Sequence, residues 1–329
     1  ILQKTTEYFK KEMMDLFKAY PSSAAQLGIA ADDIEDIYIT AATELEFWVK
    51  TPGDIAEIEE LSVSQVLQEQ YWKRTKGTVR TALEKSLLLL ERYGLKPEMG
   101  HKEVGGVRAR ISGEGKLSHI MEQLEVDWRF ANALQAADNE LLARILIKET
   151  FRRHGLEVTF MAKPMEGVAG SGEHTHVNAS ARLKSGKTVN LFAPKNMKSD
   201  FLNPVGWGAL MGLLKNYEVV NPFITSSNDA FNRLKPGFEA PICIVASLGH
   251  SVESPSRNRT VLVGLVRDME NPKSVRFEVR SPNPHTNTYL AVAAICQAML
   301  DGVKYAVKSG KSSSELENEF SKKAGGEAG

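Results

Sequence analysis

Apolar residues recur at helical spacing in several stretches of the chain. In residues 1–20, Phe9, Met13, Leu16 and Phe17 fall on one face of a helix, which Pro21 is expected to end. The same period predicts further helices, two of them closed by a glycine. They cover residues 76–93 before Gly94, 134–154 before Gly155, 204–219 and 286–308.

A period of two, typical of strands with one buried face, runs through residues 36–49. Shorter strands are predicted near residues 156–162, 173–182, 260–266 and 274–280. Because strands and helices do not follow a strict βαβ rhythm, the pattern indicates an α+β domain with a largely antiparallel sheet and flanking helices. The polar face of that sheet is the expected working surface. Two polar stretches, 105–119 and 248–258, are interpreted as loops.

The composition is that of an ordinary globular protein and narrows the range of partners. Hydrophobic residues make up 42% and charged residues 25% of the 329, and the formal net charge is zero. We therefore expect no nucleic-acid partner, and no membrane, because no apolar run reaches the ~18 residues of a span. Cys243 and Cys296 both lie in apolar runs, so two buried thiols are expected rather than a disulfide, which fits a cytoplasmic protein.

Carboxylates and histidines occupy the polar positions of two predicted strands. Glu44 and Glu46 share one strand face, roughly 7 Å apart, where neighbouring carboxylates repel unless a cation lies near them. Mg²⁺ and Mn²⁺ prefer such oxygen ligands. His174, His176 and Asn178 project together from another strand. Taken singly, a solvent-facing polar edge and a structural His-x-His pair remain the simpler interpretations.

Arginines accompany these groups. Arg276, Glu278 and Arg280 share one face of a strand whose other face is apolar, so they can bind an anion and a metal together or form a surface salt-bridge ladder. A stiff turn rich in Pro and Gly carries Arg233 and Glu239, and a second basic group lies at 257–259. Metal ligands combined with arginines indicate phosphoryl transfer. The sequence has no P-loop, because Leu117 follows Gly113-Glu-Gly-Lys116, and it has no Gly-x-Ser-x-Gly, Cys-x-x-Cys or His-Glu-x-x-His motif.

Several of these segments resemble the motifs of glutamine synthetases, most closely those of bacterial type I. The matching segments are 43–47, 160–165, 170–176, 233–241, 257–259, 276–280, 289–291 and 299–302. The resemblance runs in family order over roughly residues 1–308. It implies the catalytic-domain fold that this family shares with guanido kinases, over residues 1–329. It also implies that the family's small N-terminal domain and C-terminal extension lie outside this chain, which is expected to be a fragment.

The resemblance assigns roles to individual residues. The first metal is assigned to Glu46, Glu103 and Glu125, and the second to Glu44, His174 and Glu278. Substrate contacts are assigned to Gly170, Arg233, Glu239, Arg259 and Arg280, of which Glu239, Arg259 and Arg280 are also catalytic. ATP contacts are assigned to Glu98, His176, Asn178, Lys273 and Arg276.

The implied reaction joins ammonia to the γ-carboxylate of glutamate through a γ-glutamyl phosphate, with ATP as a substrate and two or more Mg²⁺ or Mn²⁺ ions per site. The resemblance further implies a homo-oligomeric ring or double ring, whose active site takes an Asp from a neighbour's N-terminal domain. We therefore expect this fragment alone to bind metal but to turn over poorly.

Departures from the family leave other functions open. An insert between Glu103 and Glu125 is expected to loop outward, and Gly264 stands where the family has a nucleotide-contacting Arg. Weaker ATP binding is expected unless Arg267 or Lys273 compensates. A γ-glutamyl-amine synthetase acting on methylamine or a polyamine, and a catalytically impaired regulatory homologue, remain alternatives. A phosphagen-kinase-like phosphotransferase is disfavoured, because both cysteines lie in apolar segments.

Overall fold

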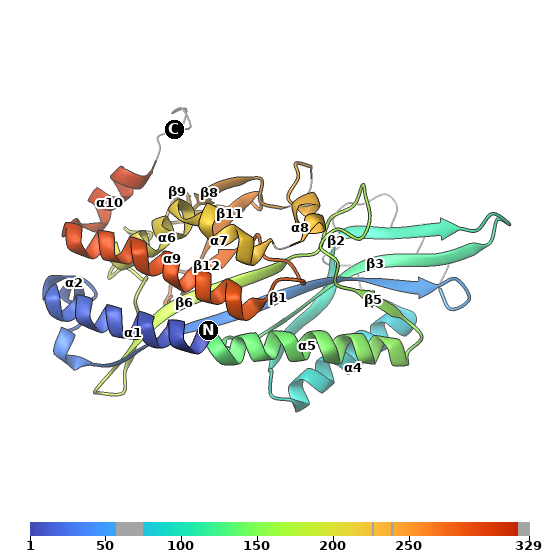
Figure 1. Ribbon diagram of the computed structural model, residues 1–329, viewed down its shortest axis with the longest axis horizontal. Coiled ribbons are helices and arrows are strands. Elements are labelled where there is room, and N and C mark those ends of the chain that lie inside the picture. Colours follow the sequence, from blue (N-terminus) through green and yellow to red (C-terminus); the bar gives the residue numbers. More distant parts are fainter. Residues whose placement is uncertain (57–74, 226, 238–239, 322–329) are drawn as a thin grey trace.

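The computed structural model describes residues 1–56, 75–225, 227–237 and 240–321, which form a long twisted sheet flanked by helices (Figure 1). The helices are α1 Leu2–Ala19, α2 Pro21–Gln26, the 3-10 helix η1 Ala31–Asp33, α4 Gly77–Arg92, α5 Ala133–Arg153, α6 Pro204–Lys215, α7 Tyr217–Ile224, α8 Asn228–Arg233, α9 Thr288–Ser309 and α10 Ser313–Phe320. The strands are β1 Ile34–Pro52, β2 Pro97–Ile111, β3 Leu117–Trp128, β4 Ala131–Asn132, β5 Glu157–Thr159, β6 Glu173–Leu183, β7 Thr188–Asn190, β8 Cys243–Ser247, β9 Gly249–Ser251, β10 Ser254–Pro255, β11 Val261–Asp268 and β12 Asn271–Val279.

The main sheet has the strand order β2-β3-β1-β6-β12-β11-β8. The short strands β4 and β5 pair with β1, and β7 pairs with β6. Within the described part of the chain, every strand pairing is antiparallel except that of β11 with β8. The predicted α+β class with a largely antiparallel sheet is therefore confirmed.

Strand β1 links two hydrophobic cores on the same face of the sheet. Its first half places Ile37 and Ile39 in a core with α1, α6 and α9. Its second half places Phe47 in a core with α4 and α5, where its ring meets that of Phe151 edge to face at 5.6 Å. Because strand side chains alternate, the intervening residues, Glu44 and Glu46 among them, face the opposite side. Helices thus cover one face of β1 and leave the other to polar groups.

The helices predicted from the period of apolar residues are all present. Helix α1 ends one residue earlier than expected, and Pro21 begins α2 at a position where its missing N–H costs nothing. The single helix expected over 204–219 divides at Asn216 into α6 and α7. The apolar helix α9 has the length and hydropathy of a membrane span, but 67% of that window is buried inside the protein, as in a core helix.

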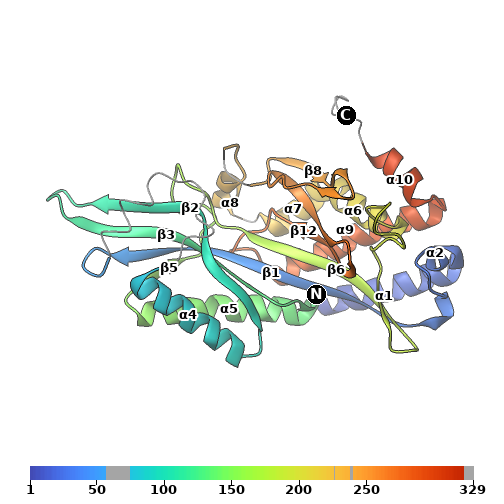
Figure 2. The ribbon, with the colours of Figure 1, turned by 180° about the vertical axis from the view of Figure 1, so that it is seen from behind.

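The interpretation of residues 105–119 as a loop was wrong. They form the outer part of a β2–β3 hairpin that projects beyond the helices, as Figure 2 shows from behind. Arg110 pairs with His119, and the turn is closed by a bond from Ser112 N to Lys116 O at 2.7 Å. The backbone hydrogen bonds between β2 and β3 satisfy the polar groups of this segment without a hydrophobic core. The pattern of apolar residues therefore gave little indication of a strand here. Residues 248–258 likewise contain the small hairpin β9–β10.

The prediction of two buried thiols was correct for Cys296 and wrong for Cys243. Cys296 lies in α9 at the centre of a core, whereas Cys243 begins β8, at the edge of the sheet. Ile242 and Ile244 beside it are also largely exposed. The apolar run around Cys243 therefore marks an edge strand and not a core segment.

Candidate active site

A cavity of about 730 Å³ opens on the polar face of the sheet. The residues predicted to bind metal all line it, namely Glu44, Glu46, Glu103, Glu125, His174 and Glu278. The predicted substrate contacts Gly170, Arg233, Arg259 and Arg280 line it as well. Glu239, the remaining predicted substrate and catalytic residue, lies outside the described residues.

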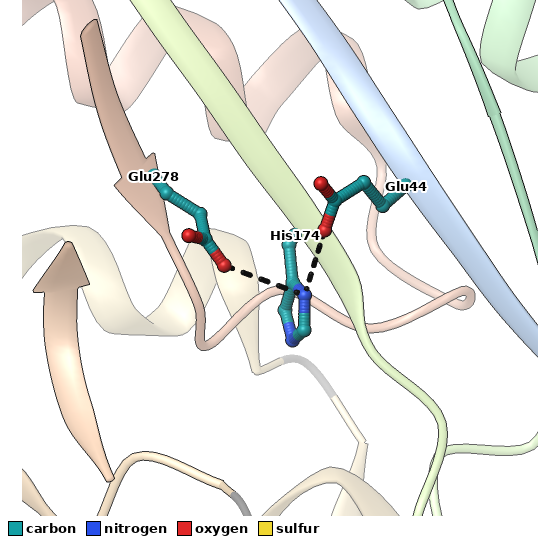
Figure 3. A group of neighbouring side chains, drawn as sticks. All are labelled: Glu44, His174 and Glu278. Atoms are coloured by element: carbon teal, nitrogen blue, oxygen red, sulfur yellow. Dashed lines mark hydrogen bonds and ion pairs between the residues drawn. The ribbon is translucent and has the colours of Figure 1, made fainter. Parts of the chain in front are cut away.

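One group of potential metal ligands joins three neighbouring strands. Glu44 of β1, His174 of β6 and Glu278 of β12 point toward one another (Figure 3). His174 Nδ1 lies 3.1 Å from Glu44 Oε2 and 3.6 Å from Glu278 Oε1. Antiparallel pairing sets this arrangement, because Glu44 is the cross-strand partner of His174. Their ligand atoms all lie within 4.8 Å of one another, close enough to hold one cation.

A second group lies deeper, on β1, β2 and β3. Glu46 and Glu125 are cross-strand partners, and Glu103 reaches them from the edge strand. Glu125 forms one compact set with Glu46 and His174, and another with Glu103 and His101. His101 Nε2 lies 3.2 Å from Glu125 Oε1. His101 was missed in the sequence, although its place two residues before Glu103 puts both on one strand face.

Gln123 holds one of these carboxylates in place. Its side-chain N–H group donates to Glu46 Oε2 at 3.1 Å and to the carbonyl of Gly170 at 2.9 Å. The backbone N–H of Gly172 donates to the same Glu46 oxygen at 2.7 Å. Gln123 is buried, so these bonds fix the orientation of the carboxylate. Gln123 was not predicted from the sequence, although its position two residues before Glu125 places both side chains on one face of the strand.

The acidic side chains of the cavity repel one another electrostatically. Burial, and then the charges of Glu44 and Glu46, raise the pKa of Glu125 well above its usual range. Burial also opposes ionisation of Glu44, but His176 and His174 outweigh it and hold the pKa of that carboxyl well below its usual range. A cation among these oxygens would relieve the repulsion. The oxygen-rich donor set with one or two imidazoles fits Mg²⁺ or Mn²⁺.

Three arginines border the acidic groups. Arg280 forms an ion pair with Glu278 and donates from Nε to the carbonyl of Arg259 at 3.2 Å. Arg259 is half-exposed, with Nη1 4.0 Å from Glu103 Oε1. Arg233 is 3% exposed, and burial lowers its pKa to about 10. It donates to the carbonyls of residues 280, 281 and 282 at 3.0–3.2 Å.

Two glycines allow the chain to approach these groups closely. A Cβ at Gly170 would lie 2.3 Å from the carbonyl oxygen of Ala162, and one at Gly172 would lie 2.5 Å from Arg233 Nη2. Any larger residue would push the segment 168–172 away from Arg233 and from Glu46. The Gly-Ser-Gly sequence is thus a packing requirement of the cavity wall.

A second cavity of about 560 Å³ adjoins the first. The residues predicted to contact ATP all line it, namely Glu98, His176, Asn178, Lys273 and Arg276. Arg276 Nε donates to His176 Nδ1 at 3.0 Å, and His176 Nε2 lies 2.8 Å from Glu44 Oε1. Glu44 lines both cavities. Phe130, also on the wall, is 69% exposed and was not predicted.

Gly264 leaves space in the first cavity beside Glu278, its cross-strand partner. A Cβ there would meet Glu278 Oε2 at 3.4 Å, an ordinary contact. Arg267 also lines the first cavity, but its guanidinium is engaged by the carbonyls of residues 197, 200 and 201, to which it donates. Of the two proposed compensating cations, only Lys273 lies beside the second cavity.

A sheet that carries clustered carboxylates, histidines and arginines beside a second polar cavity offers the types of side chain that metal-dependent phosphoryl transfer uses. The comparison with known families narrows this class. The family model described as "Glutamine synthetase, catalytic domain" matches residues 21–324. The chain belongs to the glutamine synthetase family, and it matches the catalytic domain of that family.

Individual relatives agree with the family model. The chain is 36% identical to a glutamine synthetase of Clostridium saccharobutylicum over 221 residues, which are 66% of this chain and 42% of the relative. It is 34% identical to that of Pyrococcus abyssi over 217 residues, again 66% and 42%. A Staphylococcus aureus glutamine synthetase is 37% identical over 190 residues, 56% of this chain and 38% of the relative. The match therefore spans about two fifths of these relatives.

Proposed function

We propose that the protein is a glutamine synthetase that ligates ammonia to the γ-carboxylate of L-glutamate at the expense of ATP. The observation that carries the proposal is the position of Glu44, which lines both cavities. A nucleotide in the second cavity would therefore adjoin the carboxylates and histidines of the first. Arginines border the same space, as phosphoryl transfer requires.

The proposed chemistry has two steps. An oxygen of the γ-carboxylate attacks the γ-phosphorus of ATP, the bond to the β–γ bridging oxygen breaks, and ADP leaves. Ammonia then attacks the carbonyl carbon of the γ-glutamyl phosphate, phosphate leaves, and the nitrogen loses a proton. Bound Mg²⁺ or Mn²⁺ supplies the positive charge that lets carboxylate and triphosphate approach each other.

The chain's own residues take distinct roles in this proposal. Arg259 and Arg280 stabilise charge on the transferring phosphoryl oxygens, because both line the first cavity beside the acidic groups. Arg233 and the backbone at Gly170 orient the α-carboxylate of glutamate. Glu239 is assigned the role of excluding water, which would hydrolyse the acyl phosphate. The nucleotide is held by Glu98, His176, Asn178, Lys273 and Arg276.

We propose a homo-oligomeric ring or double ring in the cytoplasm, with glutamate, ammonia and ATP as the small-molecule partners. Completion of the site by a neighbouring subunit predicts little turnover from residues 1–329 alone.

A γ-glutamyl hydroxamate assay on the complete protein tests the function. We expect product that depends on glutamate, ATP and Mg²⁺ or Mn²⁺, and its loss in Glu278→Gln but not in Glu149→Gln, a surface control. No glutamate-dependent product from the parent protein would contradict the proposal. A separate assay that compares ammonium with methylamine and a polyamine as the nitrogen donor decides the alternative: preference for either amine would make the protein a γ-glutamyl-amine synthetase.

A further inference from the structure

A buried polar cluster lies behind the cavity, on the helix side of the sheet. Glu140 of α5 is fully buried and accepts a hydrogen bond from Thr43 Oγ1 at 2.5 Å. Its other oxygen lies 3.4 Å from Nε of Arg144, one helical turn further along α5. Thr43 directly precedes Glu44 in β1, so this cluster and the potential metal ligands lie back to back across the same strand.

Arg144 connects this cluster to the loop that follows β12. Its Nη1 donates to the carbonyl of Pro284 at 2.5 Å. The loop runs from Arg280 to Asn287 without regular secondary structure, so its shape depends on such contacts. Further contacts come from Thr286 Oγ1, which donates to the carbonyl of Ile224 at 2.7 Å, and from the N–H of Glu173, which donates to that of Pro282 at 2.9 Å.

The same loop supplies the carbonyls around Arg233. Arg233 Nη1 donates to the carbonyls of Ser281 and Pro282 at 3.1 and 3.2 Å, and Nη2 donates to that of Arg280 at 3.0 Å. Pro282 lies only two residues from the carbonyl that Arg144 holds. A shift of the loop at Pro284 would therefore move these acceptors and with them the guanidinium of Arg233.

We propose that Arg144, held by Glu140, is a positioning residue for Arg233, acting from the opposite side of the sheet. This inference rests on the proposed function only in assigning the α-carboxylate of glutamate to Arg233. None of these bonds reaches a residue assigned to ATP, whereas Arg233 Nη2 also lies 3.4 Å from Nε2 of His174, a candidate metal ligand. Loss of the Arg144 anchor should therefore weaken the binding of glutamate more than the binding of ATP.

The test uses Arg144→Met, Arg144→Lys and the surface control Arg152→Met in the complete protein. Arg144→Met removes the donor and retains the apolar stem, whereas Arg144→Lys retains a donor. We expect Arg144→Met to raise the KM for glutamate about tenfold or more, as small displacements at active sites do. The KM for ATP should stay within about twofold, and Arg144→Lys should restore most of the loss.

Two outcomes would overturn the inference. One is an unchanged KM for glutamate in Arg144→Met; the other is an equal loss of glutamate, ATP and Mn²⁺ binding, which would indicate general destabilisation. If the parent protein has no glutamate-dependent activity, the proposed function fails. The positioning role can then still be tested by NMR, which measures the solvent exchange of the Arg233 N–H groups. The guanidinium N–H groups of Arg233 should then exchange faster with solvent in Arg144→Met, or in the shorter Arg144→Gln if the Met variant does not fold, than in Arg144→Lys and Arg152→Met. Equal exchange would refute the role.

Discussion

His174 Nδ1 lies 3.1 Å from Oε2 of Glu44, its cross-strand partner in the centre of the sheet. His176, two residues on, approaches the other oxygen of the same carboxylate at 2.8 Å. Glu44 thus lies between His174, which lines the first cavity, and His176, which lines the second. This one carboxylate couples the candidate metal site to the candidate nucleotide site.

Glu125→Gln should separate metal binding from stability. Because burial and the neighbouring carboxylates raise the pKa of Glu125, ionisation of this group opposes folding of the metal-free protein. Removing the charge should stabilise the metal-free protein by on the order of 1 kcal/mol while weakening Mn²⁺ binding. Urea unfolding with a chelator, beside a Mn²⁺ titration, measures both effects. A destabilised variant that retains its Mn²⁺ affinity would contradict the electrostatic account.

The same shift predicts a pH dependence of the metal-free protein. A carboxyl whose pKa is raised on folding contributes stability that is fully present below its unfolded value of 4.5 and is lost as the pH rises through the folded pKa. The contribution of Glu125 should therefore decline upward from about pH 4.5 in the parent and be absent in Glu125→Gln. Comparing the unfolding midpoints of the two proteins across this range isolates it. Parallel pH profiles would count against the raised pKa.

Gln123→Leu should weaken cation binding without removing a ligand. The variant takes away the donor that orients Glu46 and leaves an oxygen of that carboxylate with one fewer bond. Loss of such an orienting contact typically weakens metal affinity about 10- to 100-fold. Calorimetric Mn²⁺ titration measures the change, and Gln135→Leu on helix α5, a residue that lines neither cavity, is the matched control. Equal affinities of the two variants would show that Gln123 does not orient the site.

Phe130→Ala should weaken nucleotide binding with little effect on stability. The ring is 69% exposed on the wall of the second cavity, where an adenine base can stack on it. Stacking of a base on an aromatic ring contributes about 1–3 kcal/mol, so the Kd for ATP should rise about tenfold or more. Fluorescence titration with a nucleotide analogue measures it. Leu88→Ala, another exposed apolar truncation, should leave the Kd unchanged.

Gly264→Arg should strengthen nucleotide binding, because it restores the arginine that the family has at this position and whose absence is expected to lower the affinity for ATP. The site has room for a Cβ, and an added guanidinium would lie beside Glu278 in the first cavity. An added cation near the triphosphate should lower the Kd for ATP severalfold, about the effect of one exposed charge contact. Nucleotide titrations of parent and variant decide this. Equal affinities would remove the link between Gly264 and ATP binding.

Much of the fold could be predicted because the apolar period was strong. Residues 36–49 alternate so regularly that both the strand and its buried face followed from the sequence. The β2–β3 hairpin could not be predicted in the same way, because residues such as Arg108 and Arg110 pack against no core, and ladder bonds leave no hydrophobic pattern. Cys243 was misplaced for the converse reason, since an apolar run on an edge strand resembles a core strand.

The convergence of candidate site residues could be predicted only in part. Strand alternation places Glu44 beside Glu46, and His174 beside His176, from local sequence alone. That the two pairs face each other depends on the register of β1 with β6, which no local pattern specifies. His101 and Gln123 were missed because each signal is a single polar residue on a strand that the sequence did not reveal.

We expect two divalent cations to bind among six side chains, Glu44, Glu46, Glu103, Glu125, His174 and Glu278. Titration of Mn²⁺ followed by electron paramagnetic resonance counts the bound ions directly. The account predicts two sites in the parent protein, with one lost in Glu278→Gln and the other in Glu125→Gln. A parent protein that binds no Mn²⁺, or whose bound ions survive both substitutions, would contradict it.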